Sequence, residues 1–260
     1  EEAEEGAGSA ITNGIDTNVG AVVLVHGQFE DDKGTLFHTT CTGTVIARRT
    51  VLTAAHCLAS GTHTAEELAQ LDATKALTLF EGERPDRSVR GNRVVARFIH
   101  PATEKPAGLS STGAPLIKRE PLGKNDVAVL QVERPLSAPP LAIAGAVLVA
   151  PGTFVTNVGY GVTEKGTTGA QKAAGMQVES TLSSDGFILA LRGVGAGDVC
   201  GGDSGGPTLH VDPLTKKVQI LGVLSFSRGD GAAIRGCRDQ ISFAARVDQN
   251  SGFIRSHLLD

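Results

Sequence analysis

Short runs of hydrophobic residues, or of alternating hydrophobic and polar residues, recur along the whole chain. Glycine, proline, serine and asparagine separate the runs, which is typical of antiparallel β-strands joined by turns. The runs cover residues 21–27, 42–47, 77–80, 94–99, 126–132, 154–161, 186–191, 218–226 and 241–247. Many short strands without a fixed-period repeat predict an all-β sandwich or barrel.

Two segments carry helical signals instead, and both are expected to be peripheral. Thr64 and Glu67 form a capping box at the start of residues 64–71, and a second helix is expected at about residues 249–259. Three prolines within residues 133–141 interrupt the strand pattern and predict a boundary between two parts of the chain. Residues 101–125 form a long Pro/Gly/Ser-rich loop, which is either functional or a tolerated surface insertion.

Composition limits the class of protein and its partners. The chain has 260 residues, of which 40% are hydrophobic and 20% charged, as in soluble globular proteins. The net charge of −4 comes from four glutamates within residues 1–10, because the other 24 acidic residues match the 24 lysines and arginines. A near-neutral body offers no basic face for nucleic acid. No apolar run is long enough for a membrane helix, so we expect no membrane partner.

The four cysteines indicate the compartment. They allow three pairings, and none lies in the C-x-x-C spacing of zinc or redox sites. We therefore expect disulfides, which imply a secreted or periplasmic protein. The sequence begins without Met and without an apolar signal core, so we expect that any signal peptide has been removed or was never included.

A glycine-rich segment, GGDSGGP at residues 201–207, carries the first sign of chemistry. Its glycines allow a tight turn in which Ser204 could act as a nucleophile, but serine needs a neighbouring base and an orienting acid. TAAHC (53–57) offers His56 and NDVAVL (125–130) offers Asp126. Singly, these residues would be a turn residue, a packed histidine and a strand cap. Together, in this order, they predict a hydrolase.

The same segment also satisfies the G-x-S-x-G nucleophile elbow of α/β-hydrolases. That fold needs an acid and then a histidine after the serine, and Asp239 or Asp248 with His257 would have to serve. The elbow should lead into a helix, whereas Ser204 is followed by GGPTLHV, and too little chain remains for a doubly wound sheet. We reject this alternative.

The three motifs resemble those of the trypsin/chymotrypsin-like serine peptidases, in the same order. The resemblance covers about residues 11–260 and includes CTGTVIA (41–47), IHP (99–101) and VGYG (158–161). It implies a serine endopeptidase with two perpendicular six-stranded antiparallel β-barrels, the active site in the cleft between them, and a C-terminal helix. Residues 11–133 would form the barrel carrying the histidine and aspartate, and residues 134–260 the barrel carrying the serine and the specificity pocket.

The resemblance also implies a role for each site residue. His56 would be the general base, Asp126 would orient it, and the N–H groups of Gly202 and Ser204 would form the oxyanion hole. The implied disulfides are Cys41–Cys57 and Cys200–Cys237. We expect no cofactor and no metal site. Some relatives bind calcium in the loop that here carries Glu81, Glu83 and Asp86, but this spacing is no clear ligand set.

Cleavage after Arg or Lys is the specificity that we expect, and a preference for small residues is the alternative. In the resembled family, the residue six before the nucleophile lies at the pocket bottom, and here it is Asp198, which favours cleavage after Arg or Lys. The pocket walls, where glycines are usual, carry Ser227 and Ser242 instead, which would narrow the pocket and favour small residues. Ser225 to Ser227 would pair with the substrate backbone as an added β-strand.

The segment ITNG (11–14) resembles the mature N-terminus of this family. Residues 1–10 are then an activation peptide, or alternatively an acidic tail. Cleavage between Ala10 and Ile11, by another protease if the enzyme is Arg/Lys-specific, would free an amine that pairs with Asp203. We expect a monomer whose partners are protein or peptide substrates, the activating protease and a protein inhibitor. A catalytically silent binding protein on the same scaffold is the alternative function.

Overall fold

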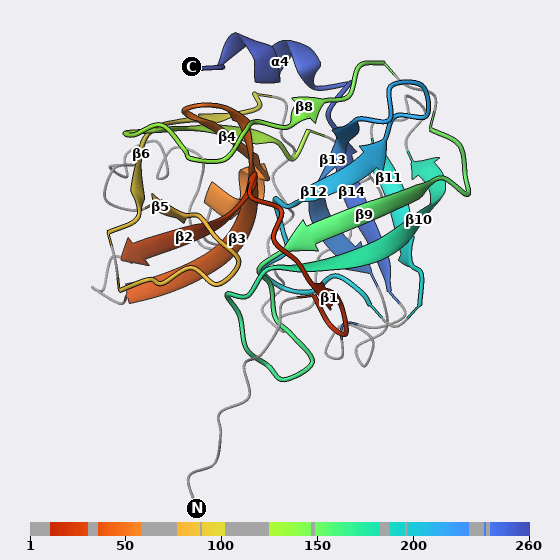
Figure 1. Cartoon of the computed structure of the whole chain (residues 1–260), viewed down its shortest axis with the longest axis horizontal. Coiled ribbons are helices and arrows are strands. Elements are labelled where there is room, and N and C mark those ends of the chain that lie inside the picture. The colour runs from red at the N-terminus through yellow and green to blue at the C-terminus, as the bar shows by residue number, and fades with distance from the viewer. Residues whose placement is uncertain are drawn as a thin grey trace, which may run out of the picture.

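The computed structural model describes residues 11–30, 36–58, 77–88, 90–101, 125–146, 149–182, 188–195, 197–228, 237 and 240–260. Their strands form two antiparallel six-stranded barrels, with one short helix near the C-terminus (Figure 1), which confirms the predicted fold class. The acidic segment 1–10, the helix predicted at 64–71 and nearly all of the 101–125 loop lie outside the described residues.

The N-terminal barrel closes in the order β2-β3-β4-β7-β6-β5. Its interior is aliphatic: Val23, Leu52 and Leu130 are at most 1% exposed, and burying such a side chain stabilises the fold by about 1.5–3 kcal/mol. A single 3-10 turn, η1 (Ala55–Leu58), follows β4. The strands are β2 (Val22–Glu30), β3 (Leu36–Ala47), β4 (Thr50–Thr53), β5 (Leu77–Phe80), β6 (Asn92–Ile99) and β7 (Ala128–Val132).

The C-terminal barrel follows the order β10-β11-β14-β13-β12-β9, and β9 closes it by pairing with β10. Two short strands extend it, β1 (Ile15–Asp16) beside β10 and β8 (Ala142–Ile143) parallel to β13. The barrel strands are β9 (Phe154–Gly159), β10 (Lys172–Leu182), β11 (Ile188–Gly193), β12 (Pro207–Val211), β13 (Val218–Arg228) and β14 (Ile241–Arg246).

Each end of the described chain attaches to the barrel built from the other half. β1 pairs with β10 of the C-terminal barrel. The helix α4 (Ser251–Ser256), shorter than the predicted 249–259, leads to His257, whose ring lies 4.2 Å from the ring of Phe98 on β6. The amide of Gln131 donates to the His257 carbonyl at 3.0 Å. The predicted boundary after residue 133 stays a prediction; β7 ends at Val132 and β8 begins at Ala142.

Two disulfides are present, Cys41–Cys57 and Cys200–Cys237, the pairings that the resemblance implies. The first joins β3 to the turn that carries His56, and the second joins the segment before Ser204 to the segment before β14. Among the described residues, no helix has the length and apolar character to cross a bilayer.

Candidate active site

His56 and Asp126 lie at the same end of two paired antiparallel strands. His56 lies on η1 just after β4, Asp126 lies just before β7, and β4 pairs with β7. His56 Nδ1 is 2.6 Å from Asp126 Oδ2, and the His56 backbone N–H donates to Asp126 Oδ1 at 2.9 Å. The carboxylate therefore holds both the ring and the backbone of the histidine, which directs Nε2 away from Asp126.

Burial and charge act in opposite directions on this pair. Burial alone would lower the pKa of His56, but the charge and hydrogen bond of Asp126 outweigh it and raise that pKa above its ordinary 6.5. Burial alone would raise the pKa of Asp126, yet the His56 charge and its hydrogen bonds, including one from the Ser225 hydroxyl, hold that pKa below 3.8. Asp126 is 5% exposed and therefore stays an anion that favours the imidazolium.

Ser225 contacts Asp126 through its side chain, which the sequence did not predict. Its hydroxyl donates to Asp126 Oδ2 at 2.5 Å across 99 residues of sequence. The sequence assigned Ser225 only a backbone role in substrate binding, and no local motif signals a partner this distant. The contact joins the C-terminal barrel to the aspartate of the N-terminal one.

Ser204 lies between β11 and β12, with its backbone against β3. Thr42 N–H donates to the Ser204 carbonyl at 2.8 Å. The Ser204 hydroxyl is 3.5 Å from the Ser225 carbonyl, and no hydrogen bond joins it to His56 among the described residues. Catalytic hydrogen bonds are often formed only when substrate is bound.

The backbone N–H groups of Gly202 and Ser204 lie where the sequence predicts an oxyanion hole. Gly202 has φ +96°, and a Cβ at this position would lie 2.8 Å from Gly161 Cα, so only glycine fits. In the part of the chain that the structure describes, neither Gly202 N–H nor Ser204 N–H donates a hydrogen bond to protein. Both donors remain available to a substrate oxygen.

Asp203 lies between these two donors and points into the protein. Its carboxylate is 1% exposed and accepts the N–H groups of Gly161 at 2.7 Å and Cys200 at 2.8 Å. Burial outweighs these bonds and raises the pKa of Asp203 to about 7. Ile11 is fully buried, and its nitrogen is not among the described donors to Asp203; in this chain that nitrogen is a neutral peptide N–H bonded to Ala10 and carries no charge.

A cavity of about 190 Å³ opens beside Ser204, where a specificity pocket is expected. The Ser227 and Ser242 hydroxyls, on paired positions of β13 and β14, lie 2.9 Å apart. Ser227 lines the cavity, whereas Asp198 and Ser242 are not among its described lining residues. The cavity is lined by Cys200, Gly201, Ser204, Leu224, Ser225, Phe226, Ser227, Cys237 and Gln240.

Asp198 is buried and accepts hydrogen bonds from backbone N–H groups. It is 5% exposed; Oδ1 accepts Val199 N–H at 2.9 Å, and Oδ2 is 3.4 Å from Gln240 N. Gln240 is itself buried, and its side-chain amide donates to the Val199 carbonyl at 2.5 Å. Sequence reasoning placed Asp198 at the pocket bottom but did not foresee Gln240 on the wall.

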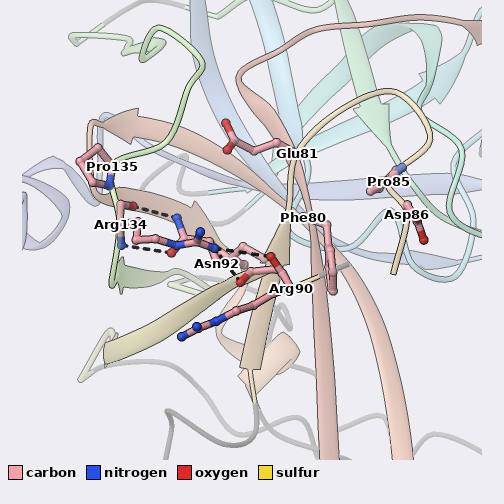
Figure 2. A pocket seen from close by; sticks show the side chains of 10 residues that line it. Phe80, Glu81, Pro85, Asp86, Arg90, Asn92, Arg134 and Pro135 are labelled. Carbon is pink, nitrogen blue, oxygen red and sulfur yellow. Dashed lines mark hydrogen bonds between the residues drawn. The ribbon is translucent and has the colours of Figure 1, made fainter. Parts of the chain in front are cut away.

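A second, larger cavity of about 250 Å³ lies beside β5 and the start of β6 in the N-terminal barrel (Figure 2), and Ser204 is not among its described lining residues. Arg134 crosses it and donates to the Gly91 carbonyl at 3.0 Å, while Asn92 and the Arg134 backbone exchange two hydrogen bonds. Glu81 accepts the Ser137 N–H and hydroxyl, both at 2.8 Å. These polar groups already have protein partners, and none of the proposed catalytic residues lines this cavity.

One group of potential metal ligands occurs among the described residues, namely Cys41, His56 and Cys57. The two cysteines are joined as a disulfide. Cysteine binds a metal as a free thiolate, which neither of these disulfide-bonded residues has, so this group is not a metal site.

Two six-stranded barrels with a buried aspartate bonded to a partly exposed histidine, near a serine in a glycine-rich turn, match the arrangement of a serine hydrolase. A comparison with protein-family models agrees, because the model described as Trypsin matches residues 11–254. The chain belongs to the trypsin family of serine peptidases.

Proposed function

We propose that this protein is an endopeptidase that cleaves peptide bonds through an acyl-enzyme on Ser204. The observation that carries the proposal is the Asp126–His56 pair, with 2.6 Å between Asp126 Oδ2 and His56 Nδ1, near a serine whose N–H, like that of Gly202, has no protein acceptor among the described residues. These groups support a base, a nucleophile and two oxyanion donors that act together.

The steps follow from these groups. Ser204 Oγ attacks the substrate carbonyl carbon while His56 Nε2 takes the hydroxyl proton, and Asp126 stabilises the imidazolium. The carbonyl oxygen becomes an oxyanion that accepts the N–H groups of Gly202 and Ser204. The C–N bond then breaks, the leaving amine takes the proton from His56, and an ester remains on Ser204. Water, deprotonated by His56, attacks the ester carbonyl; the ester C–O bond then breaks, the acid is released, and Ser204 Oγ takes the proton back from His56.

Active-site labelling separates this enzyme from a catalytically silent binding protein. A fluorophosphonate should label the wild-type chain beginning at Ile11, and Ser204→Ala in that chain should abolish labelling and peptide hydrolysis. Ser256→Ala, on helix α4, is the matched control and should retain both. A wild-type chain beginning at Ile11 that stays unlabelled at every pH between 6 and 9 would support the binding-protein alternative.

For specificity, the geometry favours small uncharged side chains. Ser227 lines the cavity and its hydroxyl lies 2.9 Å from the Ser242 hydroxyl, whereas Asp198 is not among the cavity's described lining residues. A cavity of about 190 Å³ exceeds the roughly 150 Å³ that holds a benzene ring, so a small apolar side chain fits. Cleavage after Arg or Lys is the second candidate, favoured by the buried carboxylate of Asp198.

Cuts mapped in a mixed peptide library test this choice. We expect wild-type cuts after Ala, Ser and similar residues. The double variant Ser227→Gly/Ser242→Gly should gain cuts after Arg and Lys because it removes the hydroxyls on both walls, and adding Asp198→Asn should abolish that gain. Wild-type cuts confined to Arg and Lys would contradict the small-residue preference and support the second candidate.

We also propose activation by cleavage between Ala10 and Ile11. In the described part of the uncleaved chain no cation pairs with the buried Asp203 carboxylate, and a free Ile11 amine would supply one. A pocket for small residues accepts alanine, so the enzyme itself could make this cut, whereas an Arg/Lys-specific enzyme needs another protease. The two disulfides fit a secreted or periplasmic site for this event.

Activation is tested with the full chain, the chain beginning at Ile11, and the full-length Ser204→Ala variant. We expect the Ile11 chain to be active at once and the full chain to gain activity with time. Full-length Ser204→Ala should be cut after Ala10 only when active enzyme is added. Equal initial activity of both chains would contradict activation, and a stable, inactive full chain that active enzyme cannot cut would point to a separate activating protease.

A further inference from the structure

Thr42 on β3 contacts the backbone that carries both proposed oxyanion donors. Its hydroxyl donates to the Gly202 carbonyl at 3.0 Å, and its N–H donates to the Ser204 carbonyl at 2.8 Å. One residue of the N-terminal barrel therefore fixes the carbonyls at both ends of the segment from Gly202 to Ser204.

The direction of the Thr42 hydroxyl is itself fixed. Tyr160 N–H donates to Thr42 Oγ1 at 3.1 Å, which leaves the hydroxyl hydrogen to point at the Gly202 carbonyl. The hydroxyl of Thr53 donates to the Thr42 carbonyl at 2.8 Å. Thr42 is completely buried, so water does not compete for these bonds. The elements involved adjoin, since β3 contacts β9, which ends one residue before Tyr160 (Figure 1).

The turn lies so close to β3 that it has no room to shift toward it. A Cβ at Gly205 would lie 2.4 Å from the Thr42 carbonyl oxygen and 2.1 Å from Thr53 Oγ1, and Gly205 has φ +82°. Movement away from β3 would break the two bonds from Thr42. Steric contact on one side and hydrogen bonds on the other thus fix the position of the turn.

From these contacts we propose that Thr42 is a positioning residue for the oxyanion hole. Fixing the Gly202 carbonyl restricts rotation about the backbone bonds of Gly202, a glycine that otherwise has wide conformational freedom. The N–H groups of Gly202 and Ser204 then point to one place before substrate arrives, and preorganised donors stabilise the transition state without reorganisation. Thr42 itself touches no substrate. The inference rests on the proposed peptidase activity.

The test compares Thr42→Val, which removes the hydroxyl at nearly constant shape, with Thr42→Ser, which keeps it. Loss of one oxyanion donor costs about 10²–10³ in kcat, so we expect misorientation in Thr42→Val to lower kcat by roughly 10- to 100-fold. KM should change less than about twofold, because the ground-state carbonyl gains little from the hole. A peptide boronic acid should bind more weakly by the same factor as kcat, and Thr42→Ser should stay close to wild type.

Thr44→Val is the matched control, since Thr44 is buried two residues along β3 and its hydroxyl makes no hydrogen bond among the described residues. Rates are expressed per site titrated with fluorophosphonate, so lost stability alone does not lower them. If Thr42→Val does not fold, Thr42→Ala against Thr42→Ser makes the same comparison. Unchanged kcat in the variants without the hydroxyl, or equal losses in Thr42→Ser or Thr44→Val, overturns the inference. Absence of labelling and turnover in the wild type overturns the proposed function first.

Discussion

Replacing Asp203 with asparagine should remove a pH dependence from the stability of the uncleaved protein. The native pKa of Asp203 is raised from 3.8 to about 7 by burial. A raised native pKa gives stability that is full below pH 3.8 and is lost as the pH rises through about 7, because the unfolded state releases this proton first. At about 1.4 kcal/mol for each pKa unit, the loss is about 4 kcal/mol. A typical domain has only about 5–15 kcal/mol of stability, so the effect is large.

Urea unfolding between pH 4 and pH 8 measures this loss of unfolding free energy. The disulfides are kept intact, and every sample carries Ser204→Ala to prevent self-digestion. Asparagine should cost about 1–3 kcal/mol at pH 4, because its amide nitrogen faces a backbone N–H. Between pH 4 and pH 8, the stability of Asp203→Asn relative to the aspartate form should rise by up to about 4 kcal/mol.

A control and a refuting result follow from the same contacts. Asp212→Asn removes an exposed carboxylate whose pKa is lowered by the N–H groups of Thr215 and Leu214, so it should leave the pH 4–8 slope unchanged. The chain beginning at Ile11 should show a smaller slope, since its amine would hold the pKa of Asp203 down. A stability difference between aspartate and asparagine that stays constant from pH 4 to pH 8 would refute the argument from burial.

Two further predictions concern the catalytic pair and the contact between the barrels. Because Asp126 raises the pKa of His56 above 6.5, kcat/KM should fall as the pH is lowered, with a midpoint above pH 6.5. Asp126→Asn should shift that midpoint to lower pH and reduce kcat by on the order of 10⁴-fold. Profiles of rate against pH measure both effects. Tyr160→Phe should cost about 1–3 kcal/mol, seen as a drop in Tm of roughly 3–10 °C by calorimetry, because the buried hydroxyl bonds to Gly82 O, Val22 O and Gln171 Nε2. If the midpoint of the fall in kcat/KM at low pH were the same in Asp126→Asn, the first prediction would be wrong. An unchanged Tm in Tyr160→Phe would contradict the second.

Strands with a clean apolar pattern could be predicted from sequence, and strands defined by their partners could not. All nine predicted runs overlap strands of the structure. Missed were the two-residue strands β1 and β8 and three barrel strands: β4 (Thr50–Thr53), which follows β3 after a two-residue turn, β10 (Lys172–Leu182), which has no continuous apolar run, and β12 (Pro207–Val211), which begins with proline. Pairing on both sides fixes β10 and β12, and that pairing is not visible in their own residues.

The candidate site likewise contains residues that a local sequence motif reveals and contacts that depend on strand pairing. His56, Asp126 and Ser204 each lie in a local motif, so the sequence could name them. The Ser227–Ser242 hydrogen bond depends on the register of β13 against β14, which a sequence interrupted by a loop of uncertain alignment does not reveal. The sequence could therefore state two opposed specificities, and only the structure gives a reason to prefer one.

The contacts between the barrels explain why activity should depend on how the barrels dock. Ser225 of the C-terminal barrel donates to Asp126 of the N-terminal one, and Thr42 donates in the opposite direction to the Ser204 carbonyl. Buried bonds of this kind contribute about 0.5–3 kcal/mol each, with the bond to the carboxylate at the upper end, and they are lost together if one barrel shifts against the other. A displacement near 1 Å can cost about 10²-fold in rate. Polar contacts across the barrel interface therefore act on the rate through geometry, and substitutions there should lower kcat before they lower the fraction of folded protein.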